Sequence, residues 1–289
     1  VHSGDSACTI PPHSLPAHTI KEIEKQSNTL AKALKVVGLM NIQFAIKDIE
    51  TDNPKIYILE VNPRASRTVP FVAKATGNQF AGIAARIMAG EKLSSFKILP
   101  WYKTNKISVK EAVFPFGRFP GVDTLLGPEM KSTGEAMGLA QNFGQAFAKS
   151  QMAVGSNLPK SGTLFISVKD SDKIKILPIC KKLLNLGFDI IATKGTSKYL
   201  EINNIKVTKI NKVSEGRPHL VDAIKDGLVT IIFNTTEGEQ SIKESFSLRR
   251  AALSANIPYY TTLAGSKAAT EAIISLNKDE LSVKSIQSY

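Results

Sequence analysis

Apolar residues recur at helical spacing in three stretches of the first half of this 289-residue chain. Residues 20–37 predict a helix that Gly38 ends, because glycine readily adopts the left-handed conformation found after many helices. Residues 72–88 predict a second helix, which closes at Gly90, and residues 134–150 predict a third. The spacing alone therefore gives this half of the chain a strong helical component.

Two short apolar runs lie between the first two of these helices. Residues 42–46 and 55–59 are separated by a polar segment that contains Pro54, and this arrangement predicts a β-hairpin. Further along, three prolines make residues 114–130 a loop-rich segment. The first half is thus expected to be an α+β domain.

The pattern changes at residues 148–162, where periodicity is lost and small, polar and helix-breaking residues accumulate. We place the boundary between two domains here, at 1–155 and 156–289. The second half alternates helical patterns with four short apolar runs. These predicted strands are residues 163–168, 188–192, 207–210 and 229–233. Such alternation predicts an α/β domain with a doubly wound parallel sheet.

Three polar turns follow the last three of these strands, at residues 193–196, 211–212 and 234–238. Ligands of open parallel sheets bind beyond the carboxyl ends of the strands. Hydroxyl groups, backbone N–H groups and a lysine can together hold a phosphate. One such turn is more often structural, but three at one edge of a sheet favour a bound anion.

The residues after the predicted hairpin carry a second group of polar side chains. Glu60 and Asn62 share one face of a strand, and antiparallel pairing brings Gln43 toward them. These three oxygen donors suit Mg²⁺ or Mn²⁺. Arg64 and Arg67 follow, and guanidinium groups are well shaped for phosphate oxygens. The segment predicts a site for a metal-bound nucleotide phosphate.

Composition narrows the class of protein. The net charge is +12, but the lysines are scattered and no aromatic residues are interleaved with them, which argues against nucleic-acid binding. No apolar stretch approaches the length of a membrane span, and the start resembles no secretory signal. Cys8 and Cys180 are too few for a disulfide framework. We expect a cytoplasmic protein, and the missing initiator Met suggests a fragment of a longer chain.

Four long motifs give the chain a resemblance to a known family. They are Val1-His2-Ser3-Gly4-Asp5-Ser6-Ala7-Cys8, Gly38-Leu39-Met40-Asn41-Ile42-Gln43-Phe44, the run from Glu60 to Phe71, and the run from Phe119-Pro120-Gly121-Val122-Asp123 to Gly134. In these motifs the chain resembles the C-terminal part of the carbamoyl-phosphate synthase large chain. The resemblance implies part of the second ATP-grasp domain followed by a methylglyoxal-synthase-like regulatory domain.

For the first domain, the resemblance implies a ligase that phosphorylates carbamate with ATP, for pyrimidine and arginine biosynthesis. Gln43, Glu60 and Asn62 would hold the Mg²⁺ or Mn²⁺ ions, with Gln43 and Glu60 also contacting ATP. Arg64 and Arg67 would steady the transferring phosphoryl group. His2 and Ser3 match the edge of the nucleotide pocket, although His2 could equally be structural.

The resemblance also implies what lies outside this chain. The substrates derive from bicarbonate, and a small glutaminase subunit supplies ammonia to the parent enzyme. The glycine-rich phosphate loop of the family is absent here, so we expect no synthase turnover from the fragment alone.

For the second domain, the resemblance implies a pocket for a nucleotide monophosphate such as UMP. Its candidate contacts are Lys173, Thr193, Thr196, Lys212, Asn234 and Thr236. A possible ornithine site is implied by Asp5, Glu111, Tyr259 and Thr261. The effector could be UMP, IMP or another molecule, and the oligomeric state is open, with a homo-oligomer possible.

Two other functions stay open at this point. The chain could be a free-standing effector-binding module, or a lyase like methylglyoxal synthase. The catalytic Gly-Gly-Asp turn of that lyase family is replaced here by Val213-Ser214-Glu215-Gly216-Arg217-Pro218-His219. The lyase is therefore the less favoured of the two.

Overall fold

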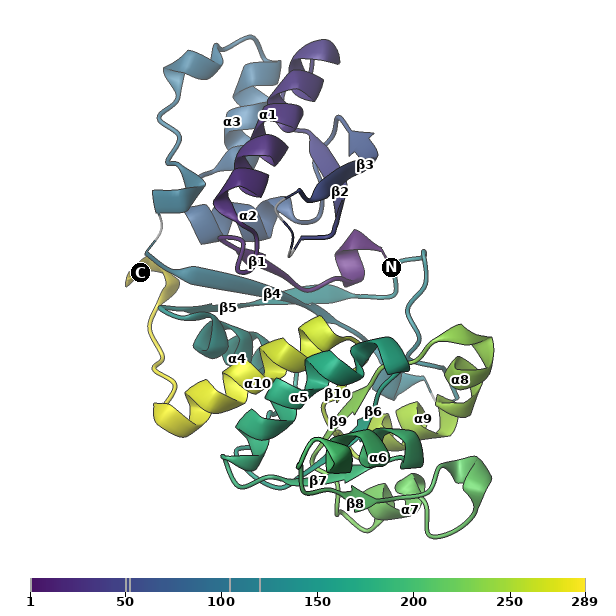
Figure 1. The fold of residues 1–289 in the computed structure, drawn as a ribbon. Helices are drawn as coiled ribbons and strands as arrows, with labels where there is room; N and C mark the ends of the chain where they lie inside the picture. Colours follow the sequence, from purple (N-terminus) through teal and green to yellow (C-terminus); the bar gives the residue numbers. More distant parts are fainter. Residues whose placement is uncertain (1, 50, 52, 104, 120, 289) are drawn as a thin grey trace. The chain divides into compact units, whose positions relative to one another are not determined.

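The computed structural model of the chain describes residues 2–49, 51, 53–103, 105–119 and 121–288 (Figure 1). They form two compact units, Thr9–Ser108 and Val1–Cys8 with Val109–Tyr289. The chain passes between the units within strands β1 (Cys8–Ile10) and β4 (Ile107–Val113). Strand β4 lies between β1 and β5 (Gly134–Ala140) in a three-stranded sheet.

The unit Thr9–Ser108 contains the predicted hairpin. Its strands β2 (Asn41–Lys47) and β3 (Lys55–Asn62) are antiparallel, which confirms the prediction. The helical elements of the unit are α1 (Ala17–Ala33), α2 (Val69–Thr76), α3 (Phe80–Met88), and the short 3-10 turns η2 (Leu93–Ser95) and η3 (Trp101–Lys103).

Two predicted helix boundaries in this unit were wrong. The stretch 72–88 is two helices, because Gly77 adopts a left-handed φ of 74° at the end of α2. Asn78 then exchanges hydrogen bonds with the backbone of Leu99, at 2.9 Å in each direction. Helix α1 ends at Ala33 rather than Val37, since Lys35 turns the chain with a φ of 50°.

The prediction of one helix over residues 134–150 was also wrong. Residues 134–140 form strand β5, and the helix α4 spans Phe143–Ala153. Gly138 explains how closely these two elements approach, because a Cβ atom at this position would overlap the carbonyl oxygen of Ala146. Pairing with β4 therefore decides the structure of a segment whose apolar pattern also suited a helix.

Residues 163–260 contain the predicted parallel sheet. Its order is β10-β9-β6-β7-β8, and all neighbouring strands are parallel. The strands are β6 (Thr163–Ser167), β7 (Asp189–Ala192), β8 (Thr208–Lys209), β9 (Ile231–Asn234) and β10 (Tyr259–Tyr260). The fifth strand, β10, was not predicted.

Helices cover both faces of this sheet, as the alternating pattern predicted. The helices are α5 (Lys173–Leu184), α6 (Lys194–Ile202), α7 (Leu220–Lys225), α8 (Gly238–Glu244), α9 (Phe246–Ser254) and α10 (Leu263–Lys278). Helix α10 packs against α5 and α4, whereas α7 packs against α9. Phe165, Ile232, Leu220, Ile224 and Leu248 form a buried cluster between the sheet and the α7–α9 pair.

The unit made of Val1–Cys8 and Val109–Tyr289 also contains short 3-10 turns, namely η1 (Ser3–Asp5), η4 (Phe116–Arg118), η5 (Asp170–Asp172), η6 (Val213–Glu215) and η7 (Ile286–Ser288). The segment between β4 and β5 otherwise has no helix or strand in its described residues, as its prolines predicted. Within the described residues, every helix is too short or too polar to cross a membrane.

Candidate functional sites

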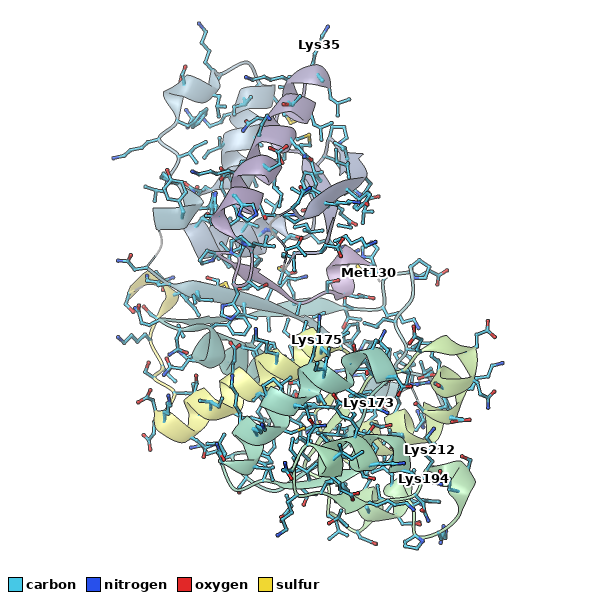
Figure 2. The ribbon with its side chains drawn as sticks, in the orientation of Figure 1. Lys35, Met130, Lys173, Lys175, Lys194 and Lys212 are labelled. Carbon is cyan, nitrogen blue, oxygen red and sulfur yellow. The ribbon has the colours of Figure 1, made fainter. Side chains whose placement is uncertain are left out.

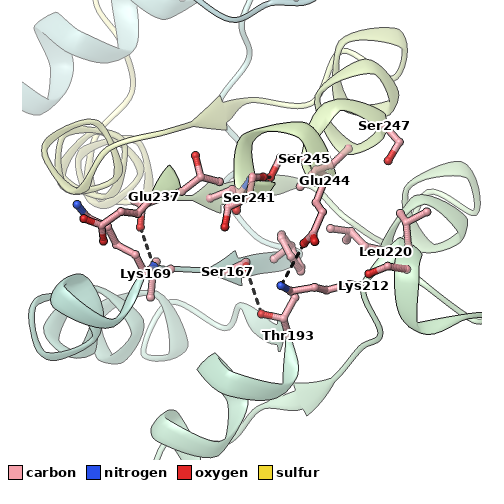
Figure 3. Close-up of a pocket in the computed structure, with 18 of the residues that line it drawn as sticks. Ser167, Lys169, Thr193, Lys212, Leu220, Glu237, Ser241, Glu244, Ser245 and Ser247 are labelled. Carbon is pink, nitrogen blue, oxygen red and sulfur yellow. Dashed lines mark hydrogen bonds and ion pairs between the residues drawn. The ribbon is translucent and has the colours of Figure 1, made fainter. Parts of the chain in front are cut away.

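A cavity of about 470 Å³ opens at the carboxyl ends of the parallel strands (Figure 3). Strands β6 and β9 are neighbours in the sheet although β7 and β8 lie between them in sequence. The chain therefore leaves β6 toward one side of the sheet and returns to the other. Such a switch point is where doubly wound sheets bind ligands, so the cavity is the candidate effector pocket.

Four of the six residues predicted for this pocket line it, namely Thr193, Lys212, Asn234 and Thr236. The other two are not among the lining residues. Thr196 is buried, and its hydroxyl accepts a hydrogen bond from the amide of Val168 at 3.2 Å. Lys173 lies next to the pocket, where its ammonium group pairs with Asp170 at 2.7 Å. Figure 2 shows Lys173 and Lys212 with the neighbouring Lys194.

Hydrogen bonds order the polar wall of the pocket. The hydroxyls of Ser167 and Thr193 lie 3.0 Å apart and join the ends of β6 and β7. The amide nitrogen Nδ2 of Asn234 donates to the hydroxyl of Tyr259 at 2.6 Å and to the hydroxyl of Ser245 at 3.2 Å. Asn234 is buried. The pocket thus has a rigid polar side built from the ends of several strands.

The charged residues of the pocket do not all favour an anion. Lys169 and Lys212 line it together with Asp170, Glu237 and Glu244. The Lys212 ammonium lies 3.6 Å from the Glu244 carboxylate. A hydrogen bond from Gln240 and the charge of Lys212 lower the pKa of Glu244, so this carboxylate is ionised. The opposite wall is apolar, with Phe165, Val213, Leu220 and Leu248.

Several lining residues were missed by the sequence analysis, namely Ser167, Lys169, Ser241, Glu244 and Ser245. Ser167 ends β6 just as the predicted turns follow β7, β8 and β9, so the same strand-end rule could have found it. The residues of α8 and its C-terminal end carried no comparable signal. Their place in the pocket depends on how this helix packs.

The second candidate site lies on the hairpin β2–β3. Gln43 is the direct cross-strand partner of Glu60, and Asn41 is the partner of Asn62. Directly opposed residues of an antiparallel pair share a face, as do residues two apart on one strand. The four side chains therefore occupy one face at the end of the hairpin. Asn41 was missed, although its spacing from Gln43 could have indicated it.

A β-bulge sets this register. Gln43 pairs with Glu60 but Phe44 pairs with Ile58, so Leu59 is the extra residue on β3. A bulge changes which face the following residues occupy. Without it, Glu60 would lie on the face opposite to Gln43. A carboxylate and three amides offer oxygen ligands of the kind that Mg²⁺ and Mn²⁺ prefer, so the residues present fit these ions.

Arg64 and Arg67 follow the hairpin site in an exposed turn. The backbone amide of Arg64 donates to the Asn62 carbonyl at 2.8 Å, which ties this turn to the end of β3. The Arg64 guanidinium donates to the Ala65 carbonyl at 3.1 Å. Both arginines are therefore available to an anionic ligand near the hairpin.

His2 and Ser3 belong to the other compact unit. Nδ1 of His2 accepts a hydrogen bond from the amide of Gly4 at 2.9 Å and caps the turn η1. The neutral ring therefore carries its proton on Nε2. The Ser3 carbonyl accepts a hydrogen bond from the buried Lys110 at 3.4 Å. The hydrogen bond from Gly4 supports a structural role for His2 as the cap of η1.

Of the four residues predicted for ornithine, Asp5 has a clear structural role. It is buried, and its carboxylate accepts hydrogen bonds from the amides of Lys131 and Ser132 at 2.8 and 2.9 Å. Burial raises the pKa of Asp5, but these hydrogen bonds outweigh it and the pKa is lowered. Asp5 therefore holds the segment before β5 in place.

Glu111 and Tyr259 lie in different networks, and Thr261 is exposed. Burial raises the pKa of Glu111 to about 7, and its carboxylate accepts a hydrogen bond from Gln151 at 2.7 Å. Gln151 in turn accepts from the Tyr260 hydroxyl at 3.1 Å. Tyr259 contacts Asn234 of the effector pocket. Within the part of the chain that the structure describes, no hydrogen bond or ion pair joins the four residues into one site.

Sequence comparisons bear on both sites. Residues 1–96 match the family model of the carbamoyl-phosphate synthase L chain, ATP binding domain, and residues 175–261 match that of the MGS-like domain. The chain is 56% identical over its whole length to the carbamoyl phosphate synthase large chain of Mesorhizobium japonicum. The corresponding identities are 54% for Brucella suis and 50% for Methanobrevibacter smithii, again over all of this chain.

The chain belongs to the carbamoyl phosphate synthase large-chain family. It spans 25% of the length of the Mesorhizobium and Brucella relatives and 27% of the Methanobrevibacter one. The two matched domains of the family lie on either side of the predicted boundary at residue 155, which itself stays a prediction. The hairpin site falls in the ATP-binding domain, and most of the pocket falls in the MGS-like domain.

Proposed function

We propose that this chain supplies part of the active site in which a carbamoyl phosphate synthase large chain phosphorylates carbamate with ATP. The observation that carries the proposal is the pairing of Gln43 with Glu60 and of Asn41 with Asn62, inside a region that matches the ATP-binding domain of the family. The expected product is carbamoyl phosphate, with ADP as the other product.

The proposed roles follow from the chemistry of the side chains. Gln43, Glu60 and Asn62 would hold Mg²⁺ or Mn²⁺, which neutralises charge on the nucleotide phosphates when bound. Arg64 and Arg67 would bind oxygens of the transferring phosphoryl group and of carbamate. Transfer of a phosphoryl group depends mainly on such positioning and charge neutralisation. His2 and Ser3 are proposed for the edge of the nucleotide pocket.

The rest of the enzyme would come from outside this chain, including a small glutaminase subunit that supplies ammonia. We therefore expect synthesis of ATP from carbamoyl phosphate and ADP by the full-length large chain and none by these 289 residues alone. The decisive variant is Glu60→Gln in the full-length chain, with Glu91→Gln as control. The Glu91 carboxylate pairs with Arg86 at 2.7 Å, away from the hairpin residues. Equal activity of the two variants would contradict the proposed metal role.

For the second site, we propose that the pocket at the sheet edge binds a nucleoside monophosphate effector. Thr193, Lys212, Asn234 and Thr236 line it and offer donors to a phosphate, while the apolar wall suits a base. Thr196 would support the pocket by fixing the Val168 amide, and Lys173 would contact the phosphate from the rim of the pocket. Calorimetric titration with UMP and IMP tests this. Lys212→Ala should weaken binding at least about tenfold, since hydrogen bonds to charged groups contribute roughly 1.5–3 kcal/mol.

The matched control for that titration is Lys198→Ala. Lys198 is an exposed residue of α6 outside the pocket lining. Loss of affinity in both variants would show a general charge effect rather than a site. Binding of neither nucleotide would remove the effector proposal and leave the catalytic one standing.

The remaining proposals rest on the sequence pattern or on the resemblance to the family. They are ornithine binding near Asp5, Glu111, Tyr259 and Thr261, a cytoplasmic location, a possible homo-oligomer, and a domain boundary at residue 155. An ornithine titration of the wild-type chain and of Glu111→Gln tests the first. Analytical ultracentrifugation tests the oligomeric state.

A further inference from the structure

A series of polar and charged side chains leads away from the pocket wall. It begins at Asn234, whose Nδ2 carries two hydrogens. Both are used inside the protein, because Nδ2 donates to Tyr259 at 2.6 Å and to Ser245 at 3.2 Å. An anion that recruits this nitrogen as a donor must therefore displace one of these partners.

Arg249 is connected to Asn234 through Ser245, whose hydroxyl accepts from Nδ2 of Asn234 at 3.2 Å and whose carbonyl accepts from the Arg249 amide at 3.0 Å. Burial raises the pKa of Tyr259 although the charge of Arg249 lowers it, so the hydroxyl stays protonated beside this cation. Arg249 lies on α9 and is only 6% exposed. A displacement of the Tyr259 hydroxyl or of Ser245 would therefore change the surroundings of the buried Arg249 side chain.

Arg249 is held by a carboxylate from a distant part of the chain. Its Nε and NH2 groups donate to the two oxygens of Asp123 at 2.7 and 2.6 Å, and NH1 donates to the Ile242 carbonyl at 3.0 Å. Bidentate pairs of this kind fix orientation as well as distance. The Arg249 side chain is buried whereas that of Asp123 is 30% exposed, so removing Asp123 would leave a buried cation without its partner, which is unfavourable. The position of Asp123 is therefore tied to that of Arg249.

Asp123 in turn organises the loop-rich segment before β5. Its carboxylate accepts a hydrogen bond from the amide of Leu125 at 3.2 Å. Phe119, Val122 and Leu125 in this segment are all exposed. The segment lies outside both stretches that the family models match, and apart from residue 120 it is described by the structure.

We propose that Arg249 is a positioning residue that couples occupation of the pocket to the conformation of residues 116–125, through Tyr259 on one side and Asp123 on the other. The inference rests on the proposed effector function of the pocket. It adds the route by which binding of an anion affects the conformation of a surface segment that lies more than a hundred positions away in sequence. The bistable element is the amide of Asn234, whose two hydrogens serve either Tyr259 and Ser245, or the anion and one of these two residues.

Hydrogen exchange of the whole chain, with and without saturating UMP, tests this coupling. We expect UMP to change the exchange rate of peptides covering residues 116–125 several-fold in the wild type. Arg249→Lys keeps the charge but cannot form the bidentate pair, and it should abolish that change while UMP still binds. By linkage, loss of coupling also shifts the affinity for UMP, so saturation is checked for each variant.

The matched control is Arg250→Lys. Arg250 is the neighbouring arginine, and its NH1 donates to the Val122 carbonyl of the same segment at 3.2 Å. It should retain the UMP-induced change, because its guanidinium contacts the backbone of the segment and does not pair with Asp123. The proposal is overturned if Arg249→Lys retains the change, or if UMP saturates the wild type without altering residues 116–125.

A second measurement keeps the coupling testable if UMP does not bind. Asn234→Ala, Asp123→Asn and the double variant are compared by melting temperature. Sites that share no network usually give additive effects. A double variant whose shift is smaller than the sum of the single shifts supports the route from Asn234 to Asp123. Additive shifts overturn it, whereas failure of UMP binding alone would count against the effector function.

Discussion

The ammonium group of Lys212 lies 3.6 Å from the carboxylate of Glu244 in the pocket at the edge of the parallel sheet. An incoming phosphate must compete with this carboxylate for Lys212. We predict that Glu244→Gln binds inorganic phosphate about 1.5- to 5-fold more tightly, since ion pairs between partly exposed side chains are weak. Calorimetry against Glu237→Gln, which removes a carboxylate that lines the same pocket, measures this. Equal or weaker binding by Glu244→Gln would refute the competition.

The hairpin site makes a prediction about metal affinity. Glu60 is the only carboxylate among the four side chains on its face. Glu60→Gln should therefore weaken Mn²⁺ binding to the full-length protein in the presence of ATP several-fold or more. Electron paramagnetic resonance counts free Mn²⁺ directly. Glu91→Gln serves as the control in the same unit, and an unchanged Mn²⁺ affinity in Glu60→Gln would exclude Glu60 as a ligand.

Glu111 predicts a pH dependence of stability. Burial raises its pKa from 4.5 to about 7, so the folded state binds this proton more tightly than the unfolded state does. The stabilisation is complete below about pH 4.5 and is lost as pH rises through 7. The loss is about 3 kcal/mol in the free energy of unfolding.

Denaturant unfolding between pH 4.5 and 8 measures this effect as the difference between the wild type and Glu111→Gln. The variant keeps the other titrating groups, Asp5 and Asp123 among them, so the difference isolates Glu111. We expect the wild type to lose stability relative to the variant as pH rises. A difference that is constant across this range would show that Glu111 is not buried as a neutral acid.

Gly144 predicts a close contact between α4 and α10. A Cβ atom there would overlap the Ser275 hydroxyl and lie 2.5 Å from the Glu271 carbonyl oxygen. We predict that Gly144→Ala lowers the free energy of unfolding by about 1–3 kcal/mol, as overpacking does. Gly195→Ala is the control, because a Cβ atom there meets only Lys173 at 3.8 Å. That variant should be neutral or stabilised by up to about 1 kcal/mol, and similar losses in both would refute the contact.

The parts of the fold that could be predicted are those where local pattern and tertiary structure agree. The strands of the parallel sheet are short apolar runs between helical patterns, and the polar turns after them had to meet at one edge. The hairpin is similar, since polar residues separate two apolar runs of matching length. Most residues of both candidate sites lie at the ends of such strands, which is why the sequence could indicate them.

The errors arose where a distant part of the chain decides the structure. Residues 134–140 carry an apolar pattern that suits a helix, but they pair with β4, and Gly138 allows α4 to approach the strand. The break between α2 and α3 depends on Asn78, which contacts Leu99 twenty-one positions later. Glu244 and Ser245 reach the pocket only through the packing of α8. Gly77 was a local signal for the break between α2 and α3, of the kind used at Gly38, whereas the strand pairing of residues 134–140 and the packing of α8 had no such signal.

The mixed charge of the pocket has a consequence for selectivity. Two lysines line it against three carboxylates, so a small, symmetrical anion gains little by entering. A ligand gains more if it also covers the wall of Phe165, Val213, Leu220 and Leu248 and offers donors to the carboxylates. We therefore expect the pocket to discriminate against small inorganic anions and to favour a larger organic anion.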